Sequence, residues 1–210
     1  MLENYEQLPN GVIRQKEYSI IEYNPEYIQT RYLNYPEKCV QMAHLRLGYL
    51  IGSIGHIPDS VLDVGYGSGE FIGVCSEIVP NCYGFDITTL PPPKNVTQVN
   101  DIYDKYYEVV TFFDVLEHFE NIYDIKRLRC KYISISLPWC HYFSDDWFRD
   151  WKHRRPNEHL YHFNSDSLIA FFQEIGYVCI NYNNIEDTIR KHKNEPNVLS
   201  AVFERINVDI

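Results

Sequence analysis

Short apolar segments alternate with amphipathic stretches from about residue 60 to the carboxyl end of the chain. Seven of these segments are rich in β-branched and aromatic residues, and each predicts a strand. They cover residues 60–65, 82–87, 96–99, 107–113, 132–137, 176–182 and 198–204. Several are apolar at nearly every position, which is typical of strands in a sheet that is covered on both faces.

Helical spacing separates several of these strands. Residues 70–79 and 165–175 carry apolar side chains at positions i, i+3, i+4 and i+7, and Pro80 and Gly176 follow them as stop signals. A third helical pattern opens at Pro36 and closes at Gly52. The alternation predicts the α/β class: a doubly wound, Rossmann-like sheet of seven mostly parallel strands, with helices on both faces and a helical extension before the first strand.

The chain length favours one decorated domain. We expect a helical cap over residues 1–57 and the main domain over residues 58–210. Residues 138–163 hold all three tryptophans and are too long for an ordinary connection, so we predict a lid or substrate-binding insertion there. The alternative for this segment is a small satellite cluster of aromatic side chains.

Composition excludes several classes of protein. Hydrophobic residues make up 45% of the chain, which argues against a disordered or fibrous protein, and the net charge of −10 disfavours binding to duplex nucleic acid. Neither a secretory signal nor an apolar run long enough for a membrane helix is visible. The six scattered cysteines favour a reduced, cytoplasmic protein. Tyrosines between residues 18 and 35 form a surface that could pack on a second copy in a homodimer or close over the site.

The strongest motif lies where the first main-domain strand turns into a helix. It reads VLDVGYGSGEF over residues 61–71. Glycines at such a turn let the backbone approach a ligand, and the helix start offers free N–H groups. The next strand ends in Asp86, which is placed to accept the two hydroxyls of a ribose. Dinucleotide folds have a third glycine where this chain has Glu70, so a nicotinamide oxidoreductase is disfavoured.

These motifs, taken in order, resemble the class I S-adenosylmethionine-dependent methyltransferases, in the branch of Methyltransf_23 and ubiquinone-biosynthesis-type enzymes. The matching segments are VLDVGYGSGEF, CYGFDI, VNDI, YEVVTFFDVLEHF and EHLYHFNSDSLIAFFQEIGY, and they span roughly residues 58–205. The resemblance implies S-adenosyl-L-methionine as cofactor. It also implies these cofactor-binding residues: Asp63, Gly65, Tyr66, Gly67, Asp86, Ile87, Asp101, Ile102, Phe113 and Asp114.

In this resemblance each part of the cofactor meets its own residues. The glycine loop would pass under the methionine and ribose, and Asp63 would hold the loop or reach the amino group through water. Asp86 would bind the ribose hydroxyls, with Ile87 against the adenine face. Residues 101–102 would flank the adenine edge, and residues 113–114 would line the sulfonium end.

The residues after the fourth strand bear on the acceptor. Asp114-Val115-Leu116-Glu117 replaces the Asn/Asp-Pro-Pro-aromatic pattern of amino-directed nucleic-acid methyltransferases. On a helix starting near Asp114, the side chains of Asp114, Glu117 and His118 would share one face. Three interpretations stay open for them: a structural role, a general base or substrate-orienting role for His118, and a divalent-metal site completed by His159 or His162. In the leading interpretation none of them binds a metal.

The leading hypothesis is a methyltransferase acting on O or N of a small molecule, with a sugar or nucleotide-sugar as the candidate acceptor. His118 is the first candidate for a catalytic residue, and His141, which follows the fifth strand, is the second. One alternative is a metal-dependent 2′-O-type RNA-end methyltransferase. Another is a non-catalytic module that only binds S-adenosylmethionine.

Overall fold

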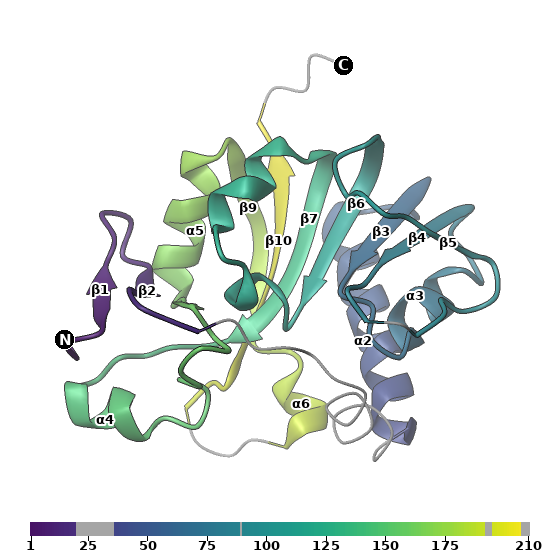
Figure 1. Cartoon of the computed structure of the whole chain (residues 1–210). Helices are drawn as coiled ribbons and strands as arrows, with labels where there is room; N and C mark the ends of the chain where they lie inside the picture. The colour runs from purple at the N-terminus through teal and green to yellow at the C-terminus, as the bar shows by residue number, and fades with distance from the viewer. Residues whose placement is uncertain (20–35, 89, 192–194, 207–210) are drawn as a thin grey trace.

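A seven-stranded sheet runs through the molecule in the order β5-β4-β3-β6-β7-β10-β9 (Figure 1). The structure, a computed structural model, describes residues 1–19, 36–88, 90–191 and 195–206. The strands are β3 (Ser60–Val64), β4 (Asn81–Phe85), β5 (Val96–Gln98), β6 (Tyr106–Phe113), β7 (Arg129–Pro138), β9 (Tyr177–Asn183) and β10 (Val198–Arg205). The first five strands of the sheet pair in parallel, and β10 runs antiparallel to both of its neighbours. All seven expected strands and their mostly parallel arrangement are confirmed.

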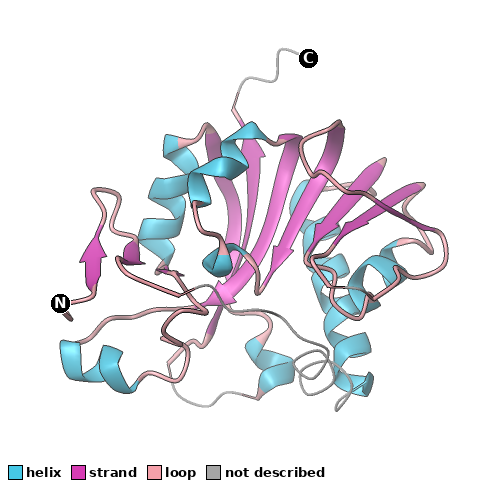
Figure 2. Cartoon of the chain, viewed as in Figure 1, coloured by secondary structure: helices cyan, strands magenta, loops and turns pink. Residues whose placement is uncertain are grey.

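Two separate cores cover the two faces of this sheet. Successive residues of a strand point to opposite faces, so Val61 packs with α2 (Pro36–Ile54) and α3 (Glu70–Cys75), whereas Leu62 packs with α5 (Ser165–Glu174) and η2 (Ile122–Arg127). Figure 2 shows the strands as one twisted layer with helices beside it. Burial on both faces explains why these strands are apolar at nearly every position.

Helix α5 illustrates how local sequence sets an element. The Asn164 side chain accepts a hydrogen bond from the Ser167 N–H (2.7 Å), and Ser167 Oγ accepts one from the Asn164 N–H (3.0 Å), which forms a capping box. Leu168, Phe171 and Phe172 are buried on one side of the helix. Gly176, at φ +92°, follows its last turn. The predicted helix over residues 165–175 is therefore confirmed by its cap, its apolar face and its stop.

The amino-terminal segment differs from the predicted helical cap. Strands β1 (Tyr5–Gln7) and β2 (Ile13–Gln15) form a hairpin, and β2 also pairs with β8 (Tyr161–His162), giving a second, three-stranded sheet. The turn contains Gly11 at φ +86°. The expectation of helix is wrong at residues 5–15. The two short strands pair with each other, and β2 also pairs with residues at least 147 positions along the chain, which periodicity does not reveal. Residues 36–54 are helical as expected, and residues 20–35 lie outside the described part of the chain.

The predicted insertion over residues 138–163 folds against this hairpin. It contains α4 (Asp145–Asp150) and β8, and a parallel bridge between Trp139 and Phe163 ties its two ends together. Phe148 is fully buried in a small core with Tyr5, Ile13 and Cys140. The segment thus forms an aromatic satellite cluster with its own packing, and a lid function for it stays a prediction.

No helix in the described residues is long and apolar enough to cross a membrane. The six cysteines are all free thiols.

Candidate functional site

Two cavities meet at the carboxyl edge of the central strands. The chain leaves β3 toward β4 and β5 on one side and returns as β6 on the other, so the ends of β3 and β6 form the switch point at which α/β sheets bind ligands. One cavity has a volume of about 340 Å³ and the other about 310 Å³. Gly65, which follows β3, and Asp114, which follows β6, line both cavities. A ligand long enough to occupy both would pass over these two residues.

Gly65 allows the two strand ends to approach each other. Its φ of +75° lies in the left-handed region, and a Cβ built on it would be 2.5 Å from Cγ2 of Val115. Its N–H donates to the carbonyl of Phe85 (2.6 Å), which ties the loop to the end of β4. Any larger residue would push the loop away from β6 or β4, so the glycine expected from the motif has a specific steric reason.

Asp86 is presented to the smaller cavity at the end of β4. Its Oδ2 accepts the Gly67 N–H (2.7 Å), and its Oδ1 accepts the Thr88 N–H (2.7 Å). Each carboxylate oxygen keeps a further lone pair, so the group can still accept two hydroxyl donors. Ile87 lines the same cavity and is 69% exposed, which leaves an apolar surface free for a flat ring.

Asp63 is a buried acid at the end of β3, in the wall of the larger cavity. It is 3% exposed, and burial raises its pKa to about 7 although Thr111 Oγ1 donates a hydrogen bond to its Oδ1 (2.7 Å). Near neutral pH the group therefore changes charge readily. A cation arriving in this cavity would favour the ionised form.

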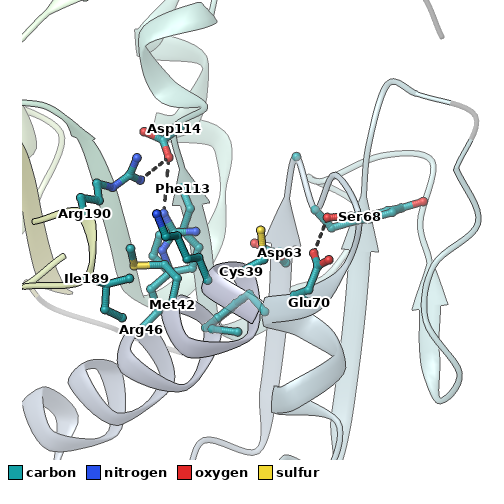
Figure 3. Close-up of a pocket in the computed structure, with 15 residues that line it drawn as sticks. Cys39, Met42, Arg46, Asp63, Ser68, Glu70, Phe113, Asp114, Ile189 and Arg190 are labelled. Carbon is teal, nitrogen blue, oxygen red and sulfur yellow. Dashed lines mark hydrogen bonds and ion pairs between the residues drawn. The ribbon is translucent and has the colours of Figure 1, made fainter. Parts of the chain in front are cut away.

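Asp114 and two arginines, Arg46 and Arg190, form ion pairs in the wall of the larger cavity (Figure 3). Arg46 of α2 and Arg190 of α6 (Asp187–Arg190) both reach Asp114 Oδ2, at 3.4 and 3.0 Å, and both bind Glu186. Enclosure opposes ionisation, but the two guanidinium charges, Arg190 first, hold the pKa of Asp114 below its usual range. Asp114 therefore carries its charge throughout the neutral range, unlike Asp63.

The backbone of Asp114 is strained in a way that aims it at both cavities. Its φ is +56°, which is uncommon for a residue with a side chain and costs energy that the surrounding contacts must offset. The N–H donates to the Ser136 carbonyl (2.8 Å), which holds the turn at the end of β6. The preceding ring, Phe113, lies between the Arg46 guanidinium (4.3 Å) and the Phe71 ring (4.7 Å). Phe113 and Asp114 thus both line the larger cavity, and Asp114 also lines the smaller one.

Arg46 and Arg190 were not among the residues expected at the site. Arg46 lies in a helix whose pattern indicated packing only, and it is 68 positions from Asp114 in the sequence. Arg190 is 76 positions away. No motif spacing connects these residues. Conservation of the two cations among homologues would have indicated them, but conservation is not visible in a single sequence.

A second group of polar side chains lies beside the smaller cavity. Glu117 and His118 belong to the 3-10 turn η1 (Leu116–His118), and His159 approaches them from the segment before β8. Their ligating atoms all lie within 4.8 Å of one another. The expected α-helix from Asp114 is wrong, because the positive φ of Asp114 turns the chain at the position where such a helix would begin.

The three residues are unusual in their surroundings. Glu117 is 2% exposed, neither of its carboxylate oxygens has a hydrogen-bond partner, and burial together with Asp114 raises its pKa. Burial lowers the pKa values of His118 and His159, so both imidazoles are neutral near pH 7. Of the two histidines that could complete this group, the structure selects His159. His162 instead contacts Tyr5, Phe148 and Trp151.

Of the remaining expected site residues, Tyr66 lies at a cavity and the others do not line the two cavities. Tyr66 lines the larger cavity, and its hydroxyl donates to the Leu90 carbonyl (2.6 Å). Asp101 caps a turn at the Tyr103 N–H (2.8 Å) and Ile102 is buried in the core, and neither lines the two cavities. His141 lines different cavities, stacks between Trp139 and Phe143, and has its Nε2 bound to the Pro196 carbonyl (2.6 Å). The structure therefore does not bring His141 together with His118.

Comparisons with known proteins agree with this geometry. A family model described as a methyltransferase domain matches residues 52–182. The fold is similar to Burkholderia thailandensis 1,6-didemethyltoxoflavin-N1-methyltransferase with bound 1,6-didemethyltoxoflavin and S-adenosylhomocysteine (TM-score 0.60, 13% identity, 97% of this chain and 100% of that chain). It is also similar to Synechocystis PCC 6803 magnesium protoporphyrin IX methyltransferase with bound SAH (TM-score 0.57, 15% identity, 90% of this chain and 90% of that chain). A third similar structure is the plantazolicin methyltransferase BpumL in complex with SAH (TM-score 0.59, 14% identity, 88% of this chain and 91% of that chain). No curated protein matches the sequence. At these identities the structural likeness is a likeness of fold.

Proposed function

The chain belongs to the class I S-adenosylmethionine-dependent methyltransferases, and we propose that it transfers a methyl group to an oxygen or nitrogen atom of a small-molecule acceptor. A sugar or nucleotide-sugar is the acceptor class to test first. The observation that carries the proposal is the pair of cavities that meet at Gly65, since each offers groups that complement one end of the cofactor.

The smaller cavity suits the adenosine part of the cofactor. Asp86 would accept the two ribose hydroxyls, and Ile87 would pack against the adenine ring. Gly67 supports this role because its N–H orients the Asp86 carboxylate (2.7 Å). Asp101 and Ile102 are proposed at the adenine edge on the family resemblance alone.

The larger cavity suits a zwitterionic amino acid. Asp63 would face the ammonium group, while Lys38, Arg46 and Arg190 bring positive charge to the same walls for the carboxylate. The sulfonium would then lie between the cavities, near Gly65 and Asp114, which line both. A cofactor with a phosphate at Glu70 would meet repulsion instead, because Glu70 lines this cavity too.

Bound S-adenosylmethionine supplies an electrophilic methyl group, and the residues of the chain must align a nucleophile with it and exclude water. Phe113 and Asp114 would wall the transfer position. His118 lines the adjoining cavity and is proposed to orient the acceptor or to take its proton. His141 remains a weaker candidate for the base, since its Nε2 is engaged by Pro196 (2.6 Å).

The aromatic side chains of the insertion over residues 138–163 favour a ring-shaped acceptor. It brings His159 next to His118, so the insertion reaches the acceptor side of the site. Another part of it, with Trp147 and Trp151, lines a cavity of about 440 Å³ together with Asp146 and Asp150. Aromatic faces flanked by carboxylates can bind the apolar face and the hydroxyls of a sugar.

Calorimetric titration with S-adenosylhomocysteine, and with NAD as a comparison, tests the cofactor. We expect binding of the first only, and Asp86→Asn should weaken it at least tenfold, whereas the exposed Asp59→Asn at the other end of β3 should not. Methyl transfer from labelled S-adenosylmethionine to a panel of sugars, nucleotide-sugars and short RNAs then tests the acceptor. Binding of NAD in place of S-adenosylhomocysteine would overturn the cofactor assignment, and transfer to RNA alone would overturn the acceptor class.

A further inference from the structure

Glu117, His118 and His159 converge from two distant parts of the chain. The first two belong to η1, directly after β6 and Asp114, and the third precedes β8. A backbone hydrogen bond from the Leu160 N–H to the Glu117 carbonyl (2.8 Å) holds the two segments together. One carboxylate oxygen and two imidazole nitrogens thereby lie within 4.8 Å of one another. The contact is built by the main chain, so it does not depend on the side chains alone.

The carboxylate of Glu117 is the unusual member of this group. Its side chain is 2% exposed, and both oxygens lack a hydrogen-bond partner among the described residues. A buried carboxylate without a partner is costly, and a bound cation relieves that cost. Ring nitrogens of His118 and His159 lie within 4.8 Å of a Glu117 oxygen, and imidazoles are metal ligands in their neutral form. Asp114, Arg155 and Arg190 also act on Glu117 electrostatically.

His159 is held in the orientation of a metal ligand. Its Nδ1 lies 2.8 Å from the carbonyl oxygen of His153, which can only accept, so the proton resides on Nδ1 and the lone pair on Nε2. A hydrogen bond from the second ring nitrogen to a backbone carbonyl is the usual support for a ligating histidine. The His153 side chain is fixed in turn by Asn197 (3.0 Å), which stabilises the segment carrying that carbonyl.

We propose that Glu117, His118 and His159 form a binding site for one divalent transition-metal ion at the wall of the cofactor cavity. Two imidazoles and one carboxylate favour Zn²⁺, Mn²⁺, Co²⁺ or Fe²⁺ over Mg²⁺ and Ca²⁺. Ligands about 2.1 Å from a tetrahedral ion lie about 3.4 Å apart, so side chains whose ligand atoms lie within 4.8 Å of one another close by up to about 1.4 Å when the ion binds. Three protein ligands leave coordination positions open for oxygen atoms of an acceptor.

The position of the site gives the ion a role in methyl transfer. His118 also lines the cavity that contains Asp86 and Asp114, so an ion bound to it lies beside the proposed transfer position. An acceptor hydroxyl on the ion would be oriented and more acidic, and His118 would act as a ligand rather than as a base. This role rests on the proposed function, whereas ion binding itself does not.

Titration of the metal-free protein with Co²⁺, followed by visible absorption, tests the site. We expect one ion per chain with the spectrum of a nitrogen-ligated ion, displaced by Zn²⁺. Glu117→Gln, His118→Ala and His159→Ala should each weaken binding at least tenfold, whereas His44→Ala, which removes an exposed histidine from α2, should not. Circular dichroism verifies that each variant is folded, and Glu117→Gln keeps the size of the side chain if an alanine variant does not fold.

S-adenosylhomocysteine binding, measured on the same samples, separates this proposal from the cofactor assignment. We expect Glu117→Gln and His159→Ala to retain it, because neither residue lines the cofactor cavities. Absence of stoichiometric Co²⁺ binding in the parent protein, or equal binding by all four variants, would overturn the metal site even if S-adenosylhomocysteine binds normally. Loss of S-adenosylhomocysteine binding in the parent would count against the proposed function only.

Discussion

We expect the buried carboxyl of Asp63 to make cofactor binding depend on pH. Burial raises its pKa to about 7 in the free protein. If the ionised form faces the ammonium of the ligand, only the ionised fraction of the protein binds. That fraction is roughly one eleventh at pH 6 and ten elevenths at pH 8, so we expect the affinity for S-adenosylhomocysteine to rise about tenfold between them.

Thr111→Val isolates the cause of this dependence. The substitution keeps the shape of the side chain and removes the donor that lies 2.7 Å from Asp63 Oδ1. A hydrogen bond to a charged group contributes about 1.5–3 kcal/mol, which corresponds to a rise of about 1–2 units in the pKa of Asp63. At pH 7 the ionised fraction then falls from about one half to between roughly one eleventh and one hundredth, so the affinity should fall about 5- to 50-fold.

Isothermal titration calorimetry at pH 6, 7, 8 and 9, in two buffers of different ionisation enthalpy, measures both affinity and proton release. The affinity of Thr111→Val should approach that of the parent only near pH 9. Thr97→Val serves as the matched control, since it changes an exposed threonine on β5 of the same sheet. Asp63→Asn should bind weakly at every pH and release no proton.

A flat affinity for the parent from pH 6 to pH 9 would refute the reasoning, because Asp63 would then hold the loop without contacting the ammonium. So would a Thr111→Val profile that coincides with the profile of the parent. Thermal unfolding of each variant distinguishes either result from a loss of folded protein.

Three further predictions concern stability and affinity. Without ligand, the contribution of Asp63 to the free energy of unfolding should be greatest below about pH 4 and be lost as the pH rises to about 7, because its pKa is raised in the folded protein. The total change in the free energy of unfolding should be about 4 kcal/mol, and urea titration of the parent and of Asp63→Asn across this pH range measures it. Gly176→Ala should lower the free energy of unfolding by about 1–2 kcal/mol, because Gly176 has a φ of +92° but no atom near the position of an added Cβ. Gly65→Ala should lower it more and abolish S-adenosylhomocysteine binding, because the added Cβ would meet Val115. Equal decreases in the unfolding temperature of the two variants would contradict this. In calorimetry, Asp86→Asn should weaken S-adenosylhomocysteine more than Asp101→Asn, because only Asp86 lines a cavity.

The sequence was most informative where local pattern and burial coincide. The seven strands of the main sheet could be predicted because a doubly covered strand must be apolar on both faces, as Val61 and Leu62 illustrate. The glycine loop and Asp86 could be located because a fixed spacing connects them to strand ends. Both predictions depend on residues that lie close together in the sequence or on a regular pattern of side chains along a strand.

Other features depend on contacts that no local pattern encodes. Strand β2 lies between β1 and the distant β8 and pairs with both, and its three residues are too few to show a periodicity of their own. The turn at Asp114 replaces a helix because its backbone is held in the left-handed region by the ends of β6 and β7. The choice of His159 over His162 follows from β8, which directs His162 toward Tyr5 and Phe148. For each of these, the deciding partner lies far along the chain.

Asp63 and Asp114 lie at the same edge of the sheet but have pKa values shifted in opposite directions. Asp63 lies in β3 and Asp114 directly after β6, and both line the larger cavity, yet burial raises the pKa of Asp63 while Arg190 and Arg46 lower that of Asp114. Environments that separate two such values are typical of active sites. Asp114 keeps its charge at any working pH and can fix the position of the two arginines, whereas Asp63 gains its charge when a cation arrives. The pH dependence of cofactor binding should therefore report on Asp63 alone, and a substitution of Arg190 should change affinity without moving its midpoint.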